Sequence, residues 1–127
     1  MIVRPVTALL ALVALGCGDR PAAPLVVVRG LVTFRGAPLP GGLVVFTPDD
    51  EYGGRGPCAT GTIGPDGRYT LATDGAAGVA PGKHRVTVAG PDGWRLPDQL
   101  LDPQSSKLKA DVIAGRENVV DLELQDR

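Results

Sequence analysis

Apolar and polar residues alternate along most of the chain after residue 24. Between residues 25 and 35, one face of an extended segment would carry Val26, Val28, Gly30, Val32 and Phe34, and the other face Arg29 and Thr33. A period of two is typical of a strand with one buried face. Six further segments are short, rich in Val, Leu, Ile or Thr, and predicted as strands: 43–47, 59–63, 68–72, 83–89, 108–114 and 117–124.

Glycine, proline and aspartate separate these segments. Gly64-Pro65-Asp66-Gly67 predicts a tight hairpin, because Asp-Gly supplies the positive backbone φ that such turns need. The longest stretch without strand character is 90–106, with a short helical turn expected near 97–101. No window past residue 20 repeats apolar residues at helical spacing without a glycine or proline. We therefore predict an all-β fold, a seven-stranded antiparallel β-sandwich spanning residues 25–127.

Residues 1–17 have a different character. Arg4 precedes an apolar run of about ten residues, which is too short to cross a bilayer. Gly16 then provides a small residue directly before Cys17. Ala14-Leu15-Gly16-Cys17 resembles the lipobox of bacterial lipoproteins, although its leucine stands one place later than usual. The alternative is an ordinary secretory signal followed by an incidental cysteine.

The lipobox reading divides the chain into three parts. Residues 1–16 would be a cleaved signal peptide, and Cys17 would become the first mature residue and carry diacylglycerol on its sulfur. Residues 17–24 would form the lipidated cysteine and a flexible tether to the sandwich. Cys17 would then hold the protein in the bacterial cell envelope. The outer membrane is favoured, because Gly18 replaces the aspartate of the known inner-membrane retention signal.

Charge and cysteine content narrow the function classes. The formal net charge is −1, so the chain has no basic surplus for binding nucleic acid. The two cysteines are Cys17 and Cys58. With Cys17 lipidated, Cys58 would have no intramolecular disulfide partner. We expect Cys58 to be a small apolar side chain at a strand start, the alternative being a reactive or dimer-forming thiol.

The ordered motifs resemble those of carboxypeptidase regulatory-like domains. The matching stretches are 29–41, which contains Gly-Ala-Pro-Leu-Pro-Gly, 59–71, which contains Pro-Asp-Gly-Arg-Tyr, and 81–88, Pro-Gly-Lys-His-Arg-Val-Thr-Val. Residues 106–124 are similar to the C-terminal part of small lipoproteins from planctomycete genomes. The resemblance covers residues 26–124 and implies a transthyretin-like (prealbumin-like) sandwich. It carries over no catalytic residue, and His84 stands where the family commonly has an aromatic residue.

Residues with catalytic or metal-binding chemistry are few. His84 is the sole histidine, and we expect it to be half-buried and hydrogen-bonded rather than a general base. Ser105 and Ser106 are adjacent in a loop and suggest no catalytic triad. Asp49-Asp50-Glu51 could offer oxygens to calcium, but its spacing matches no EF-hand, so solvated acids are expected. We predict no catalytic residue, metal or cofactor, and no enzymatic activity.

Two aromatic residues are candidates for ligand binding. Trp94 and Tyr52 lie in glycine-rich loops, where an exposed ring could stack on a sugar, although a lone tryptophan in a sandwich more often covers the core. The expected function is a non-catalytic, lipid-anchored envelope module with a structural or protein-interaction role. The alternative is a module that binds envelope polysaccharide. The expected partners are the membrane, through the lipid on Cys17, and an envelope protein or polysaccharide.

Overall fold

A computed structural model describes residues 24–54 and 56–125. The signal peptide, Cys17 and the tether up to residue 23 therefore lie outside the described residues. The described chain forms strands β1 Val28–Phe34, β2 Ala37–Pro38, β3 Leu43–Pro48, β4 Ala59–Thr62, β5 Arg68–Thr70, β6 Ala72–Thr73, β7 Ala76–Ala77, β8 Gly82–Ala89, β9 Leu108–Val112, β10 Asn118–Val119 and β11 Leu122–Leu124. Two short 3-10 helices join them, η1 Asp50–Tyr52 and η2 Asp98–Leu101.

Every segment predicted as a strand overlaps one or two of these elements, and η2 confirms the helical turn expected near residues 97–101. The number of strand elements exceeds seven for two reasons. The predicted strands 68–72 and 117–124 are each interrupted and form two elements. In addition, β2 and β7 are two-residue arms of tight hairpins, and such short arms carry no alternation that a sequence pattern could reveal.

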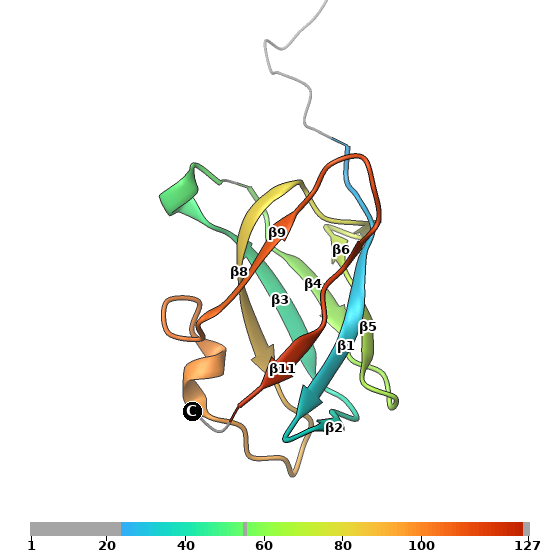
Figure 1. Cartoon of the computed structure of the whole chain (residues 1–127), viewed down its shortest axis with the longest axis vertical. Coiled ribbons are helices and arrows are strands. Elements are labelled where there is room, and N and C mark those ends of the chain that lie inside the picture. The colour runs from blue at the N-terminus through green and yellow to red at the C-terminus, as the bar shows by residue number, and fades with distance from the viewer. Residues whose placement is uncertain (1–23, 55, 126–127) are drawn as a thin grey trace, which may run out of the picture.

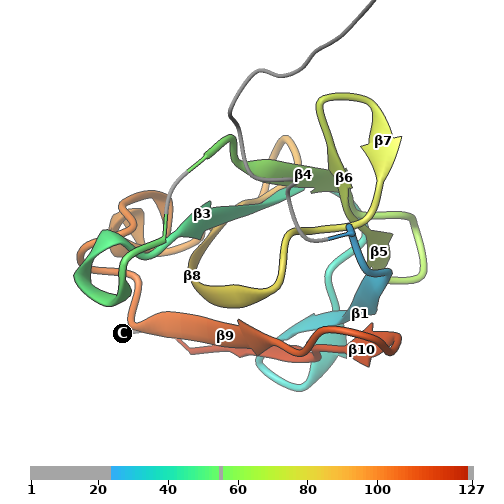
Figure 2. The ribbon, with the colours of Figure 1, turned by 90° about the horizontal axis from the view of Figure 1, so that it is seen from above.

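The strands form two sheets that face each other (Figures 1 and 2). One sheet is antiparallel throughout, in the order β7-β6-β4-β3-β8-β9. The other is built on β1, which pairs antiparallel with β2 and β5 and parallel with β10 and β11. The fold is thus an all-β sandwich dominated by antiparallel pairs. The prediction of a wholly antiparallel sandwich is wrong for β1, because the first and last strands of the chain run side by side in the same direction.

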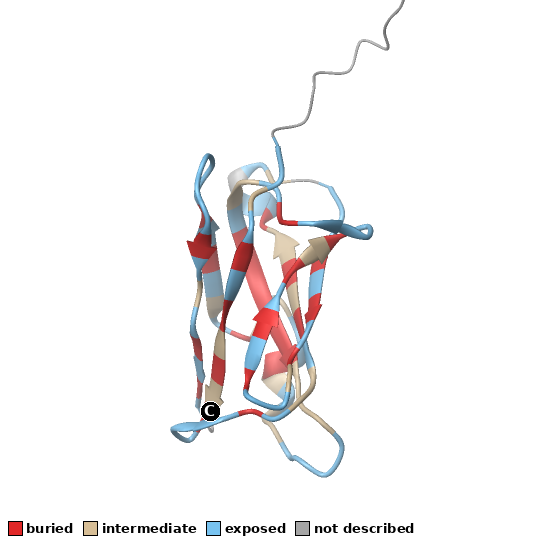
Figure 3. Cartoon of the chain, turned by 90° about the vertical axis from the view of Figure 1, so that its right-hand side faces the viewer, coloured by how far each residue is buried: buried red, intermediate tan, exposed pale blue. Residues whose placement is uncertain are grey.

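The core lies between the sheets, and inward-facing side chains alternate with exposed ones along the strands (Figure 3). Its largest fully buried side chains include Phe46, Leu39 and Leu71. In β1 the predicted face is confirmed, since Val28, Gly30, Val32 and Phe34 are all buried.

The predicted hairpin around Gly64–Gly67 forms its turn but not its full pairing. The amide of Gly67 donates to the carbonyl of Gly64 at 2.9 Å, and Gly64 donates to Arg68 at 2.8 Å. Beyond this turn β5 pairs with β1, whereas β6 returns to pair with β4. Leu71 lies at this change of sheet, and its amide donates to the Val28 carbonyl of the opposite sheet.

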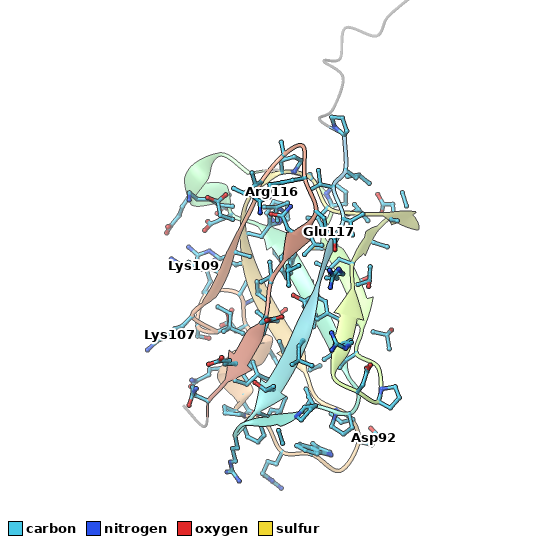
Figure 4. All side chains as sticks on the ribbon, turned by 45° about the vertical axis from the view of Figure 1, so that its right-hand side comes forward. Asp92, Lys107, Lys109, Arg116 and Glu117 are labelled. Atoms are coloured by element: carbon cyan, nitrogen blue, oxygen red, sulfur yellow. The ribbon has the colours of Figure 1, made fainter. Side chains whose placement is uncertain are left out.

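The two ends of the sandwich differ. The described chain starts at the end near Val28, which also carries η1 and the turn at Arg116 and Glu117; we call this the N-terminal end (Figures 1 and 4). The opposite, distal end carries β2 and the loop after β8 (Figure 1). The seven residues of β1 separate the two ends by about 23 Å. Neither described helix is long and apolar enough to cross a membrane.

Candidate functional site

Trp94 is held at the distal end by a turn directly after β8. The amide of Trp94 donates to the carbonyl of Pro91 at 3.1 Å, and Gly93 has a φ of 86°, which glycine adopts without steric cost. Leu96, two residues on, packs against the core. The turn and this anchor leave Trp94 projecting, with 41% of its surface exposed.

Phe34, the last residue of β1, packs against the indole of Trp94. The two rings meet edge to face, with their centroids 6.3 Å apart and their planes at 63°. The guanidinium carbon of Arg35 lies 5.0 Å from the centroid of the same Phe34 ring, within cation–π range. Trp94 and Arg35 are far apart in the sequence, yet both contact the ring of Phe34, a buried residue that is only 6% exposed.

Arg35 occupies a turn position that seldom carries an arginine. Arg35 and Gly36 have φ values of 55° and 82°, and they join β1 to β2 as a two-residue hairpin loop. Such loops need positive φ at both residues and favour Asn-Gly or Asp-Gly. The loop between β6 and β7 has the same form and uses the favoured pair, Asp74 and Gly75, with φ values of 51° and 82°. The first strand, which was predicted to run to residue 35, therefore ends at Phe34.

These residues surround a cavity of about 530 Å³, which we call the Trp94 cleft; its lining is Phe34, Arg35, Ala37, Gly93, Trp94 and Arg95. Its size lies within the usual range of small-ligand sites. Among the described residues, its lining contains two arginines and no carboxylate. Two further cavities adjoin it, one sharing Arg35 and Arg95 with the cleft and the other sharing Trp94 and Arg95, and both are also lined by Asp98. The cleft thus combines an exposed aromatic face with positive charge.

The two aromatic candidates from the sequence do not share a site. Tyr52 lies in η1, which follows β3 at the N-terminal end. Trp94 lies in the loop after β8, at the distal end. The eight residues of β8 correspond to about 26 Å of strand between the two positions. Phe34, Arg35 and Arg95 were not among the site residues predicted from the sequence. The position of Arg95 next to Trp94 was a usable signal for one of them, but nothing local links Arg35 to residue 94.

The side chains of His84 and Ser106 are both buried and contact the backbone. His84 is more deeply buried than predicted, at 3% exposure, with its ring centroid 5.8 Å from that of Phe46. Its Nε2 lies 2.9 Å from the carbonyl oxygen of Ala80, while Nδ1 has no hydrogen-bond partner among the described residues. The buried Ser106 hydroxyl donates to the carbonyl of Val86. Both side chains thus bond to backbone carbonyls.

The acidic segment after β3 is not simply solvated, contrary to expectation. Asp49 is buried, and its carboxylate accepts a hydrogen bond from the amide of Glu51 at 3.1 Å. The same carboxylate lies 3.2 Å from Nε of the buried Arg85, and Nη2 of Arg85 lies 3.2 Å from Glu51. The Nε contact is an ion pair without hydrogen-bond geometry. This cluster ties the loop after β3 to the outer face of β8.

Neither a metal site nor a disulfide is found within residues 24–54 and 56–125. No group of three or more His, Cys, Asp or Glu side chains in that part of the chain could hold a metal ion. Cys58 directly precedes β4, as predicted, but its side chain is exposed rather than packed, with Sγ 3.5 Å from Oγ1 of Thr47.

Comparison with known proteins adds no assignment to this geometry. No protein-family model, curated protein or solved structure matches the chain. Within the described residues, the Trp94 cleft combines an exposed aromatic ring, two cations and a cavity of ligand size.

Proposed function

We propose that this protein is a lipid-anchored, non-catalytic module of the bacterial cell envelope that binds polysaccharide through the Trp94 cleft. The observation that carries this proposal is the 41% exposed indole in a cavity of about 530 Å³. Flat aromatic rings with one open face pack against the apolar face of sugar rings, and polar groups beside them bond to hydroxyls. Arg35 and Arg95 supply such polar groups.

The position of the cleft suits an anchored protein. The proposed anchor is the lipid on Cys17, and residues 18–24 would reach at most about 25 Å from it. The cleft lies at the distal end, about 23 Å further along β1. A sandwich tethered this way would direct the Trp94 cleft away from the membrane, toward polymers of the envelope.

The finer fold assignment is also a proposal. We assign the sandwich to the transthyretin-like, carboxypeptidase regulatory-like type on the sequence resemblance. The roles of its motif residues support this: Gly30 allows a close backbone approach inside the sandwich, and Gly67 completes a tight turn with a φ of 86°. A non-catalytic role is supported by the use of His84 and Ser106 as partners of backbone carbonyls.

Binding can be measured directly, because Trp94 is the single tryptophan of the chain. The full-length protein in a non-ionic detergent would be titrated with a panel of soluble polysaccharides while its indole emission is followed. We expect saturable emission changes with at least one polymer. Retention of the protein on immobilised polymer should be lost in Trp94→Ala and kept in the matched aromatic variant Tyr52→Ala. If no polysaccharide is bound, the binding proposal is wrong and a structural or protein-interaction role takes its place.

Anchoring is tested separately. Cys17→Ala should move the protein out of the membrane fraction and abolish labelling by a fatty-acid analogue. Cys58→Ala removes the other cysteine and should change neither result. Unchanged membrane association of Cys17→Ala would overturn the proposed anchor.

A further inference from the structure

Positive charge is concentrated at the cleft although the protein as a whole is slightly acidic. The formal net charge is −1, so a general basic surface does not explain any attraction of anions. In the Trp94 cleft, by contrast, Arg35 and Arg95 are the only charged lining residues within 24–54 and 56–125. Arg95 forms no ion pair with any residue in the described part of the chain. Asp98 is not among the described lining residues of the cleft, but it lines an adjoining cavity together with Arg35 and Arg95.

The conformation of Arg35 is a second, independent indication. A left-handed backbone costs a residue with a Cβ about 1–2 kcal/mol, and Asn or Asp adopts it more readily. The chain uses Asp in the equivalent loop at Asp74 but arginine at the cleft. Turn formation therefore does not explain why position 35 is an arginine. The placement of its guanidinium over Phe34 at the cleft explains this choice.

Resting on the proposed function, we infer that the Trp94 cleft selects acidic polysaccharides, whose sugar rings carry carboxylates. The indole packs against a sugar ring, and the guanidinium groups of Arg35 and Arg95 bond to carboxylates on the same or the neighbouring sugar. Arginine suits this role, because its planar donors match the two oxygens of a carboxylate. Asp92 and Asp98 are exposed, and Asp98 lines an adjoining cavity together with both arginines. Their negative charge weakens the general attraction of anions, so selection depends on direct contact of the guanidinium groups with the ligand.

The test compares two forms of one polymer. Polygalacturonate and its fully methyl-esterified form share a backbone and differ in the charge of their carboxyl groups. The full-length protein in non-ionic detergent would be titrated with each, following Trp94 emission. We expect the acidic form to bind at least about tenfold more tightly, as one charge-assisted hydrogen bond provides. Raising the salt concentration should weaken binding of the acidic form and leave the esterified form unchanged.

Three variants locate the effect. Arg35→Asn keeps a residue that tolerates the left-handed turn, and Arg95→Gln keeps a long polar side chain; each should reduce the preference for the acidic form about tenfold. Arg116→Gln removes one positive charge at the N-terminal end and should change nothing (Figure 4). Circular dichroism and thermal melting verify that each variant is folded.

The outcomes separate the inference from the proposed function. Equal binding of the two polymer forms would overturn the selectivity and leave polysaccharide binding standing. Binding of neither form, together with no binding across the wider panel, would overturn both. A preference for the acidic form that survives in Arg35→Asn and Arg95→Gln would overturn the assignment to the Trp94 cleft.

Discussion

Gly30 lies against the backbone between β10 and β11, and its replacement by alanine should be severely destabilising. A Cβ at position 30 would lie 1.8 Å from the carbonyl oxygen of Val120 and 2.6 Å from the carbonyl carbon. The Tyr69 ring would be 3.1 Å away. Carbon–oxygen contacts in proteins rarely fall below about 3.3 Å. The backbone around Val120 would therefore have to move by more than 1 Å, because a contact of 1.8 Å would have to lengthen to about 3.3 Å.

Such a movement would cost free energy, because it would break two hydrogen bonds and disturb a packed interior. The buried hydroxyl of Tyr69 donates to the Val120 carbonyl, and the Val120 amide donates to the Arg29 carbonyl at 2.8 Å. Losing each bond costs about 1 kcal/mol, and forcing an extra methyl group into a packed interior costs about 1–3 kcal/mol. We expect Gly30→Ala to lower the free energy of unfolding by about 3–5 kcal/mol, a large part of a typical domain's stability.

Urea denaturation followed by far-UV circular dichroism measures this change. The control is Gly64→Ala, whose Cβ would meet only a carboxylate oxygen of the flexible Asp66 at 3.2 Å and the Arg68 carbonyl at 3.6 Å. We expect the control to change stability by less than about 1 kcal/mol. A Gly30→Ala protein as stable as this control would refute the close-approach argument, and with it the structural explanation of the first motif glycine.

Two further predictions concern buried polar groups. Burial, with a smaller contribution from Asp121, raises the pKa of Tyr69, so its hydroxyl stays protonated in the folded protein while it ionises in the unfolded chain above about pH 10. Wild-type stability should fall there by up to about 1.4 kcal/mol per pH unit more steeply than that of Tyr69→Phe in urea titrations at pH 8–11; parallel pH curves would contradict this. Asp49→Ala leaves the charge of Arg85 buried without its buried partner and should cost about 3–5 kcal/mol in thermal or urea unfolding. Glu51→Ala, whose side chain is 65% exposed, should cost less than about 1 kcal/mol, and equal losses in the two variants would show that the burial of Asp49 is not decisive.

Local patterns predicted the strands and turns of this protein well. The period-two alternation in β1 identified its inward face, because the pleat places alternate side chains on opposite sides of a strand. In β8 the alternating sequence did not predict burial, since Arg85 and Thr87 are buried as well as His84, Val86 and Val88. The Asp66-Gly67 turn was also readable, since its backbone angles are a property of the two residues themselves. Pairing was not readable in the same way. Two pairings join segments that are far apart in the sequence. β5 pairs with β1, and the chain changes sheet at Leu71 directly after it; β1 also pairs in parallel with β11.

The candidate site shows the same division. A tryptophan in a glycine-rich loop was recognisable as a candidate, and Cys17 remains a prediction from the sequence alone, outside the described residues. The cleft itself exists only because β1 ends at Phe34 beneath the loop that follows β8, which brings Arg35 to the indole across a long sequence separation. Backbone preferences and side-chain periodicity act over a few residues, so the sequence determined the elements and the proposed anchor. Contacts between sheets depend on how the whole core packs, so only the tertiary structure decided which side chains meet Trp94.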